Sequence, residues 1–195
     1  MLAAVILSGG ASSRMGSPKA LLAYQGRPFL EHLLDVTKRP EIGVRRVVLG
    51  ADAGPIARAI RLHADEIVIN PDWQKGQLSS IQAGVRSLPP GTEGLVLCLI
   101  DHPLISAALV GELIGQFYQS RKAIVLPVFE GRRGHPVIFA ATLYSELLHA
   151  PLEPGARAVV WAHPGDVLEL STNEQGCVLN LNDPETMNKA IGGGI

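Results

Sequence analysis

The sequence predicts an α/β fold in which a mostly parallel sheet lies between two layers of helices. Short apolar runs alternate with amphipathic stretches along the chain, and most of these runs are continuous in valine, isoleucine and leucine. Such runs are typical of strands that are covered on both faces. An alternating strand and helix order favours parallel pairing with helices on both sides. The predicted architecture is therefore a three-layer α/β/α sandwich with a mixed, mostly parallel sheet.

The predicted elements follow one another without a linker, an internal repeat or a low-complexity tract. The expected strands are residues 3–7, 46–49, 66–69, 94–100, 123–127 and 137–139, and the last of these is the candidate for an antiparallel direction. The expected helices are 29–38, 55–63, 79–87, 107–119 and 141–149, and residues 166–182 are expected to form two more short strands around 173–176. A chain of 195 residues can bury one full core, so we expect residues 1–195 to form a single domain.

Composition excludes several classes of protein. The apolar fraction of 47% excludes a disordered chain, and a net charge of -1 provides no broad basic field for nucleic acid. The N-terminal apolar run is short and lacks basic residues before it, so neither a signal peptide nor a membrane span is expected. Cys98 and Cys177 lie in apolar runs without a CxxC spacing, which indicates reduced core residues. We therefore expect a cytoplasmic protein without nucleic-acid or membrane partners.

A glycine-rich loop with two basic residues follows the first predicted strand. Gly9 and Gly10 permit a close approach of the backbone to a ligand, and successive backbone N–H groups of such a loop can bind an anion. Ser12 adds a hydroxyl donor, while Arg14 and Lys19 add charge-assisted bonds to phosphate oxygens. The spacing is neither that of a P-loop nor the Gly-x-Gly-x-x-Gly of dinucleotide-binding folds. The loop predicts phosphate binding; the alternative is an ordinary glycine-rich turn.

Residues 7–19 read Leu-x-Gly-Gly-x-Ser-x-Arg-Met-Gly-x-x-Lys, which resembles the signature of nucleotidyltransferases with the nucleotide-diphospho-sugar transferase fold. Within that group the chain is most similar to the enzymes that attach CMP or GMP to molybdopterin. The resemblance implies that this loop wraps a nucleoside triphosphate and that Arg14 and Lys19 are catalytic contacts to its phosphates. The nucleotide-binding residues that it implies here are Leu7, Ser8, Gly9, Gly10, Ser12, Arg14 and Lys19.

A second loop, residues 70–81, precedes a predicted helix whose N-cap we expect at Ser79 or Ser80. It resembles the Asn-Pro-x-Trp-x-x-Gly-x-x-x-Ser segment of cytidylyltransferases, in which the serine that matches Ser80 lies near the base. Both serines are therefore candidate nucleotide-binding residues, and helix capping is the alternative. We interpret Trp73 as a core anchor.

Asp101 directly follows a buried apolar run, at the strand end that faces ligands in such sheets. Mg²⁺ prefers one or two carboxylates together with phosphate oxygens, so Asp101 is a candidate catalytic metal ligand, although it could instead cap the next helix. The resemblance supports the first role, because Asp-x-Pro at this place matches the family's metal-binding aspartate. Many relatives carry glutamine or methionine where this chain has His102, which is either an acceptor contact or a harmless substitution.

Two further segments complete the resemblance. Residues 131–137 resemble the Gly-x-x-Gly-His-Pro segment near the acceptor of molybdopterin cytidylyltransferases, which makes Arg133 and His135 candidate acceptor contacts; a solvated turn is the alternative for the arginine. Residues 180–185 resemble the Asn-x-Asn-Thr-Pro-Glu segment of guanylyl-transferring relatives, in which the residue matching Asn182 helps to hold the metal.

The resemblance implies a Mg²⁺-dependent enzyme that moves an NMP group from an NTP to a phosphorylated acceptor. Segments 70–80 and 134–136 favour CTP, whereas residues 9–10 and 180–182 resemble the GTP-using branch. We expect CTP as the nucleotide and molybdopterin as the acceptor. GTP is the alternative nucleotide, and a sugar phosphate or another phosphorylated alcohol is the alternative acceptor. A molybdoenzyme or its chaperone is a candidate partner. The competing hypotheses are a non-catalytic nucleotide-binding module that delivers the cofactor and an NAD-binding protein.

Overall fold

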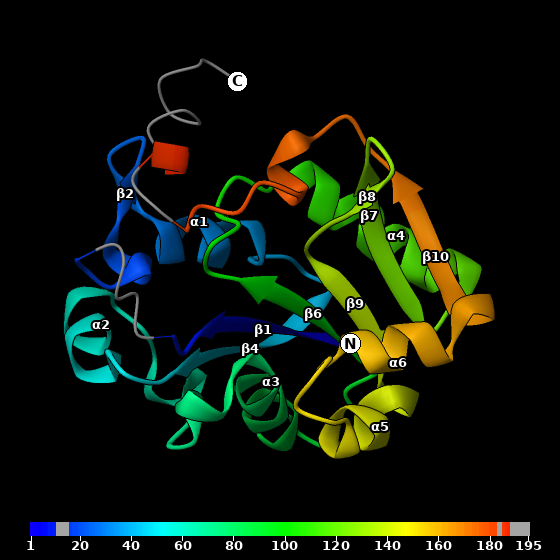
Figure 1. The fold of residues 1–195 in the computed structure, drawn as a ribbon, viewed down its shortest axis with the longest axis horizontal. Helices are drawn as coiled ribbons and strands as arrows, with labels where there is room; N and C mark the ends of the chain where they lie inside the picture. The colour runs from blue at the N-terminus through cyan, green and yellow to red at the C-terminus, as the bar shows by residue number, and fades with distance from the viewer. Residues whose placement is uncertain (11–15, 183–184, 188–195) are drawn as a thin grey trace.

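An eight-stranded sheet forms the centre of the protein, seen here in a computed structural model that describes residues 1–10, 16–182 and 185–187 (Figure 1). The strand order is β10-β7-β9-β6-β1-β4-β5, and β8 pairs with β7. The strands are β1 (Leu2–Ser8), β4 (Ile42–Leu49), β5 (Ile67–Ile69), β6 (Gly94–Leu99), β7 (Ile124–Phe129), β8 (Arg132–Arg133), β9 (Val137–Ala140) and β10 (Val167–Ser171). A separate hairpin joins β2 (Ala23–Tyr24) to β3 (Arg27–Pro28).

Most of the sheet is parallel, as the sequence predicts. β1 pairs in parallel with β4 and β6, β4 with β5, and β10 with β7. β9 is antiparallel to both β6 and β7, and β8 is antiparallel to β7. The antiparallel direction expected for residues 137–139 is therefore confirmed, and the ends of β1, β4 and β6 meet at one edge of the sheet.

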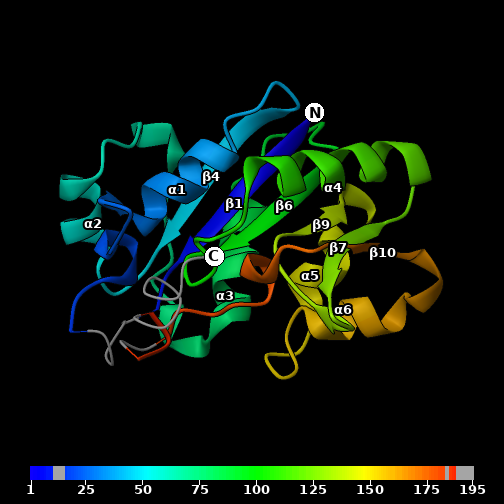
Figure 2. The same ribbon diagram turned by 90° about the horizontal axis from the view of Figure 1, so that it is seen from above.

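Helices cover both faces of the sheet (Figure 2). One layer contains α1 (Phe29–Val36) and α4 (Ala107–Ser120), and α2 (Ala53–Ala59) packs with them through Ile56. The other contains α3 (Gln77–Arg86), α5 (Tyr144–His149) and α6 (Arg157–Ala162). Successive residues of a strand point to opposite faces, so Ile6 of β1 joins the first core cluster and Val5 the second. The three-layer α/β/α sandwich is confirmed.

Three local expectations were wrong. Helix α3 begins at Gln77 with Gly76 as its N-cap, earlier than Ser79 or Ser80. Gly76 has a φ of 96°, which favours glycine and ends the preceding 3-10 turn, while the Ser79 hydroxyl donates to the carbonyl groups of Asp72 and Gly76. Of the two strands expected within residues 166–182, the first is confirmed as β10, whereas the second is absent, because a 3-10 turn, Gln175–Cys177, follows β10. Glu174 explains this turn, because its carboxylate accepts hydrogen bonds from Ser106 at the start of α4.

The third wrong expectation is the single helix over residues 141–149. A 3-10 turn, Ala141–Leu143, occupies the first part of this range, and α5 begins only at Tyr144. A further helix, α6, comes after α5, and the sequence did not predict it.

Both cysteines are buried and unpaired, as expected, and burial raises the pKa of the Cys98 thiol to about 12. In the described part of the chain, no helix is long and apolar enough to cross a membrane.

Candidate active site

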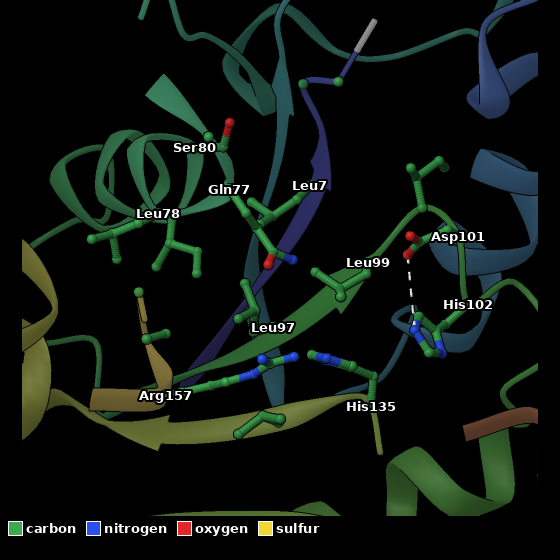
Figure 3. Close-up of a pocket in the computed structure, with 18 of the residues that line it drawn as sticks. Leu7, Gln77, Leu78, Ser80, Leu97, Leu99, Asp101, His102, His135 and Arg157 are labelled. Carbon is green, nitrogen blue, oxygen red and sulfur yellow. Dashed lines mark ion pairs between the residues drawn. The ribbon is translucent and has the colours of Figure 1, made fainter. Parts of the chain in front are cut away.

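A deep cleft of about 1110 Å³ opens at the edge where β1 and β6 end. Its walls come from the loop after β1, the start of α3, the residues after β6, the β8–β9 turn and residues 152–161 (Figure 3). Single small-molecule sites usually have volumes of roughly 300–1,000 Å³. The cleft is therefore large enough for two substrates side by side.

One wall of the cleft brings Gly9 against Ser80. A Cβ atom built on Gly9 would lie 2.7 Å from the Ser80 Oγ atom. The buried Asn70 amide holds the neighbouring hydroxyls, since its Nδ2 atom donates to Ser79 Oγ at 2.9 Å and to Ser80 Oγ at 3.0 Å. Leu7, Ser8 and Gly10 line the same wall. The fold thus joins two of the predicted nucleotide-binding segments.

Trp73 is not the core anchor that we expected, because it is only partly buried and lines the cleft. Gly50, directly after β4, explains why Trp73 lies at this wall. A Cβ atom at Gly50 would overlap the Gly9 carbonyl oxygen and lie 2.7 Å from Trp73 Cβ. The Ala51 N–H also donates to the Gly9 carbonyl at 3.4 Å. Gly50 and Trp73 therefore fix the backbone of Gly9, a role that only a lone glycine after a strand could have suggested in the sequence.

Lys19, Asp101 and Asn182 gather at the end of β6 although they are far apart in the sequence. The Lys19 ammonium donates to Asn182 Oδ1 and lies 3.9 Å from Asp101 Oδ2. The backbone N–H of Leu181 donates to the Asp101 carbonyl at 2.8 Å, which ties the C-terminal segment to this strand end. Side chains of Lys19 and Asp101 are 17% and 20% exposed, so both remain within reach of a ligand.

The donors at this place fit a hard divalent cation only in part. A carboxylate and an amide oxygen are suitable ligands for Mg²⁺. Within the described ranges, no group of three or more His, Cys, Asp or Glu side chains could hold a metal ion. An ion at Asp101 and Asn182 would therefore complete its coordination with phosphate oxygens and water.

Two histidines lie beside this cluster. The ring of His102 is 5.0 Å from that of His135, and its Nε2 atom lies 3.9 Å from Asp101 Oδ1 (Figure 3). Burial lowers the pKa of His102, and the Asp101 charge opposes this shift. Burial, helped by His102 and Arg157, lowers the pKa of His135 to about 3, so its ring is neutral near pH 7. Among described residues, the buried Nδ1 atoms of both rings have no hydrogen-bond partner.

The arginines of the cleft differ in their partners. Arg133 binds Glu169 of β10 through its Nε atom at 2.7 Å and its terminal nitrogen at 2.6 Å. Arg157, at the start of α6, points toward His135 across the floor of the cleft (Figure 3). No ion pair with a carboxylate joins Arg157 in the described part of the chain. Sequence reasoning missed Arg157, because it lies in a short helix with no motif around it.

Two predicted phosphate-binding residues, Ser12 and Arg14, belong to residues 11–15, which lie outside the described residues. The other predicted site residues line the cleft directly, except Ser79 and Asn182. Ser79 donates a hydrogen bond to the carbonyl of Gly76 and Asn182 accepts one from Lys19, and both Gly76 and Lys19 line the cleft.

Residues 4–167 match the family of MobA-like NTP transferase domains. The chain is 33% identical over 145 residues to nicotine blue oxidoreductase of Paenarthrobacter nicotinovorans, covering 71% of each chain. It is 34% identical over 110 residues to a molybdenum cofactor guanylyltransferase of Xanthomonas euvesicatoria pv. vesicatoria, covering 56% of this chain and 52% of that protein. The first relative is thus named for a redox activity and the second for nucleotidyl transfer.

Among solved structures, Rv0371c of Mycobacterium tuberculosis H37Rv superposes with a TM-score of 0.84 at 24% identity, covering 98% of this chain and 99% of that one. A manganese complex of the same mycobacterial protein superposes with a TM-score of 0.79 at 23% identity and 99% coverage of both chains. These likenesses support the fold. Because the family match spans most of the sequence, the chain belongs to the MobA-like NTP transferase family and is a nucleotidyltransferase.

Proposed function

We propose that this enzyme transfers an NMP group from an NTP to a phosphorylated acceptor and releases pyrophosphate. The observation that carries the proposal is the meeting of Lys19, Asp101 and Asn182 beside the Gly9–Ser80 wall, in a cleft with room for two substrates. An acceptor phosphate oxygen would form a bond to the α-phosphorus while the bond to the β-phosphate oxygen breaks.

Catalysis in such a reaction is mainly positioning and charge stabilisation. Lys19 would neutralise charge on the phosphates, with Arg14 as a second cation. Asp101 and Asn182 would hold a divalent ion, which we propose to be Mg²⁺ and which would supply positive charge at the phosphates. Their oxygen donors, and their position around the Lys19 ammonium, support this assignment.

We propose CTP as the preferred nucleotide and GTP as the alternative. Residues 70–80 and 134–136 favour CTP, whereas Gly9-Gly10, residues 180–182 and the relative named as a guanylyltransferase favour GTP. The base would lie against Gly9 and Ser80, with Leu7, Ser8 and Gly10 in the same wall and Ser79 held beside Ser80 by Asn70. Ser12 would contact the phosphates.

A Gly9→Ala substitution is expected to shift the ratio of kcat/KM for CTP and GTP toward CTP by roughly 1–3 kcal/mol, the usual range for steric trimming of a pocket. The physical reason is the 2.7 Å approach of the new Cβ to Ser80 Oγ, which pushes that hydroxyl toward the base. In a Ser80→Ala background the close contact is removed, and the shift should shrink. An unchanged ratio in both backgrounds would show that this wall does not select the base.

For the acceptor we propose molybdopterin, contacted by His102, His135 and Arg133. The place of all three side chains in the lining of the cleft, with the His102 ring beside both Asp101 and His135, supports this. A sugar phosphate or another phosphorylated alcohol is the alternative acceptor, and a molybdoenzyme or its chaperone is the proposed partner that receives the product.

Pyrophosphate release with each of the four NTPs, with and without molybdopterin, tests the proposal. We expect release with CTP, less with GTP, and a requirement for molybdopterin and Mg²⁺. Nucleotide binding without pyrophosphate release, for every NTP and both with and without molybdopterin, would instead indicate a module that only delivers a cofactor.

A redox enzyme is the second candidate function, favoured by the 33% identical relative named as an oxidoreductase. Residues 8–16 lack the Gly-x-Gly-x-x-Gly spacing of dinucleotide-binding loops, which weighs against it. Titration of the protein with NADH and NADPH separates the candidates, because binding of either cofactor at micromolar concentration without pyrophosphate release would favour the second.

A further inference from the structure

The segment that follows β10 lies along the loop that carries Asp101. Residues 174–181, which we name the strap, begin shortly after the edge strand β10 and line the cleft through Val178 and Asn180. Residues 100–106, which we name the β6–α4 loop, connect the end of β6 to the N-cap of α4 and include Asp101. In Figure 1 the strap is the orange to red segment that crosses this loop. The strap and the loop are distant in the sequence, so no motif predicts their contact.

The outer end of the strap is fixed by a carboxylate. Glu174 accepts hydrogen bonds from the backbone N–H of Ser106 at 3.2 Å and from its hydroxyl at 2.5 Å. The same hydroxyl accepts a bond from the Leu109 N–H at 3.0 Å, so Ser106 is both the N-cap of α4 and the partner of Glu174. Two residues along the strap, a Cβ atom on Gly176 would overlap the Leu104 carbonyl oxygen. The backbones of the two segments therefore touch beside the Glu174 contact.

The inner end of the strap reaches the candidate metal ligand. The Leu181 N–H donates to the Asp101 carbonyl at 2.8 Å. Between the two ends, the Cys177 carbonyl accepts a hydrogen bond from the His135 N–H at 2.8 Å, and a Cβ atom on Gly134 would lie 2.5 Å from that carbonyl oxygen. The contacts thus run in antiparallel order along the β6–α4 loop, and the same strap also fixes the backbone of His135.

The two ends of the β6–α4 loop are held by different parts of the fold. The sheet anchors its start, where the Ile100 N–H donates to the Leu7 carbonyl at 3.1 Å. Its far end is fixed where Ser106 meets Glu174. A carboxylate on a loop that has lost one anchor would shift relative to an ion bound to phosphates. A misplacement of about 1 Å, caused by a change far from the reacting atoms, can cost about 10²-fold in rate.

We propose that Glu174 is a positioning residue, which acts through Ser106 and the strap to hold the β6–α4 loop so that the Asp101 carboxylate faces the divalent ion. Glu174 does not line the cleft, and the bonds at Leu181 and Cys177 are made by backbone atoms, which substitution of those residues would retain. The Glu174 side chain is therefore the point at which the strap can be loosened without changing the lining of the cleft. The inference rests on the proposed function, because it takes Asp101 as a metal ligand.

Binding of Mn²⁺ tests the inference independently of turnover, because Mn²⁺ prefers the same oxygen ligands as Mg²⁺ and its free form is measured by electron paramagnetic resonance. The protein is saturated with CTP or GTP, whichever binds more tightly, and Mn²⁺ bound by nucleotide alone is subtracted. Glu174→Ala should weaken Mn²⁺ binding by about 10- to 100-fold, the usual cost of losing a group that orients a metal ligand. The kcat of pyrophosphate release at limiting Mg²⁺ should fall by a similar factor.

Binding of the same nucleotide in the presence of a chelator should change by less than about twofold in Glu174→Ala, because distant sites without shared partners respond independently. This separation is expected because the Gly9–Ser80 wall comes from the loop after β1 and from α3, which are not part of the strap or the β6–α4 loop. A general loss of structure would instead weaken nucleotide binding under both conditions.

Two further variants serve as controls. Glu174→Gln keeps an oxygen acceptor for Ser106 and should restore most of the Mn²⁺ affinity. Glu66→Ala is the matched control, because the Glu66 carboxylate also fixes a turn, through the His63 N–H at 2.9 Å and an ion pair with Arg45, but does not line the cleft. It should lower the melting temperature and leave both the Mn²⁺ affinity and kcat unchanged.

A Glu174→Ala protein with a lowered melting temperature but with the Mn²⁺ affinity and kcat of the parent protein would overturn the inference, because Glu174 would then only stabilise the start of α4. If Glu174→Ala does not fold, Glu174→Asp decides, since a side chain shorter by one methylene group should also weaken Mn²⁺ binding and parental affinity would again overturn the inference. Failure of the proposed function is distinct: Asp101→Ala would then bind Mn²⁺ like the parent protein, which removes the metal ligand that Glu174 is inferred to position.

Discussion

Asp101→Ala is expected to reduce the kcat of pyrophosphate release by about 10²-fold or more, as is typical for deleting a main source of charge stabilisation. Asp101 supplies the only carboxylate in the described cluster with Lys19 and Asn182, and no other described acidic residues complete a metal site. Without it, a divalent ion would have the Asn182 amide oxygen as its one remaining protein ligand there. Binding of the ion should therefore weaken, and raising Mg²⁺ should recover part of the lost rate.

The fold should survive this substitution. The Leu181 N–H binds the backbone carbonyl of Asp101, which Asp101→Ala retains, and the side chain is outside the apolar core clusters. A thermal melt like that of the parent protein is expected. Asp166→Ala is a matched control, because Asp166 is exposed and does not line the cleft. Near-normal turnover of Asp101→Ala at limiting Mg²⁺ would refute its assignment as a metal ligand.

The sheet was predictable because each of its main strands is visible in the sequence as a continuous apolar run. Residues such as Val5, Ile6, Val96 and Leu97 form continuous apolar runs, and only strands covered on both faces need such runs. Even the reversed strand β9 could be identified as a candidate, since a tight turn joins it to the strand before it. The position of the candidate residues at strand ends was also predictable, because parallel strands bring their carboxyl ends to one edge.

Residues outside the strands were harder to predict. Helix α6 has six residues, too few for a helical period to stand out, so Arg157 and Trp161 gave no sign that they share a face in the cleft. The turn at Gln175–Cys177 depends on the bond from Ser106 to Glu174, two residues that are distant in the sequence. Trp73 was misjudged because a large aromatic residue is usually buried, whereas here the bare backbone of Gly50 lets it pack at the rim.

The second large effect is expected at Lys19. The proposed role of its ammonium group can be tested separately from that of the metal ion. Lys19 contacts both Asn182 and Asp101, and in the proposed function its charge neutralises the phosphates. A charge-assisted hydrogen bond contributes about 1.5–3 kcal/mol, which corresponds to roughly 10- to 100-fold in affinity. This contribution needs no divalent ion, whereas that of Asp101 does.

Lys19→Ala should therefore weaken the binding of CTP or GTP by about 10- to 100-fold both with Mg²⁺ and with a chelator present. Asp101→Ala, by contrast, should weaken it only with Mg²⁺, and with a chelator it should bind as well as the parent protein or better, because one negative charge has been removed. Calorimetric titration of both variants under both conditions measures the four affinities, with Lys38→Ala as a control for an exposed lysine outside the cleft. If Lys19→Ala binds normally in the presence of the chelator, Lys19 does not contact the phosphates directly and acts only by positioning Asn182 and Asp101.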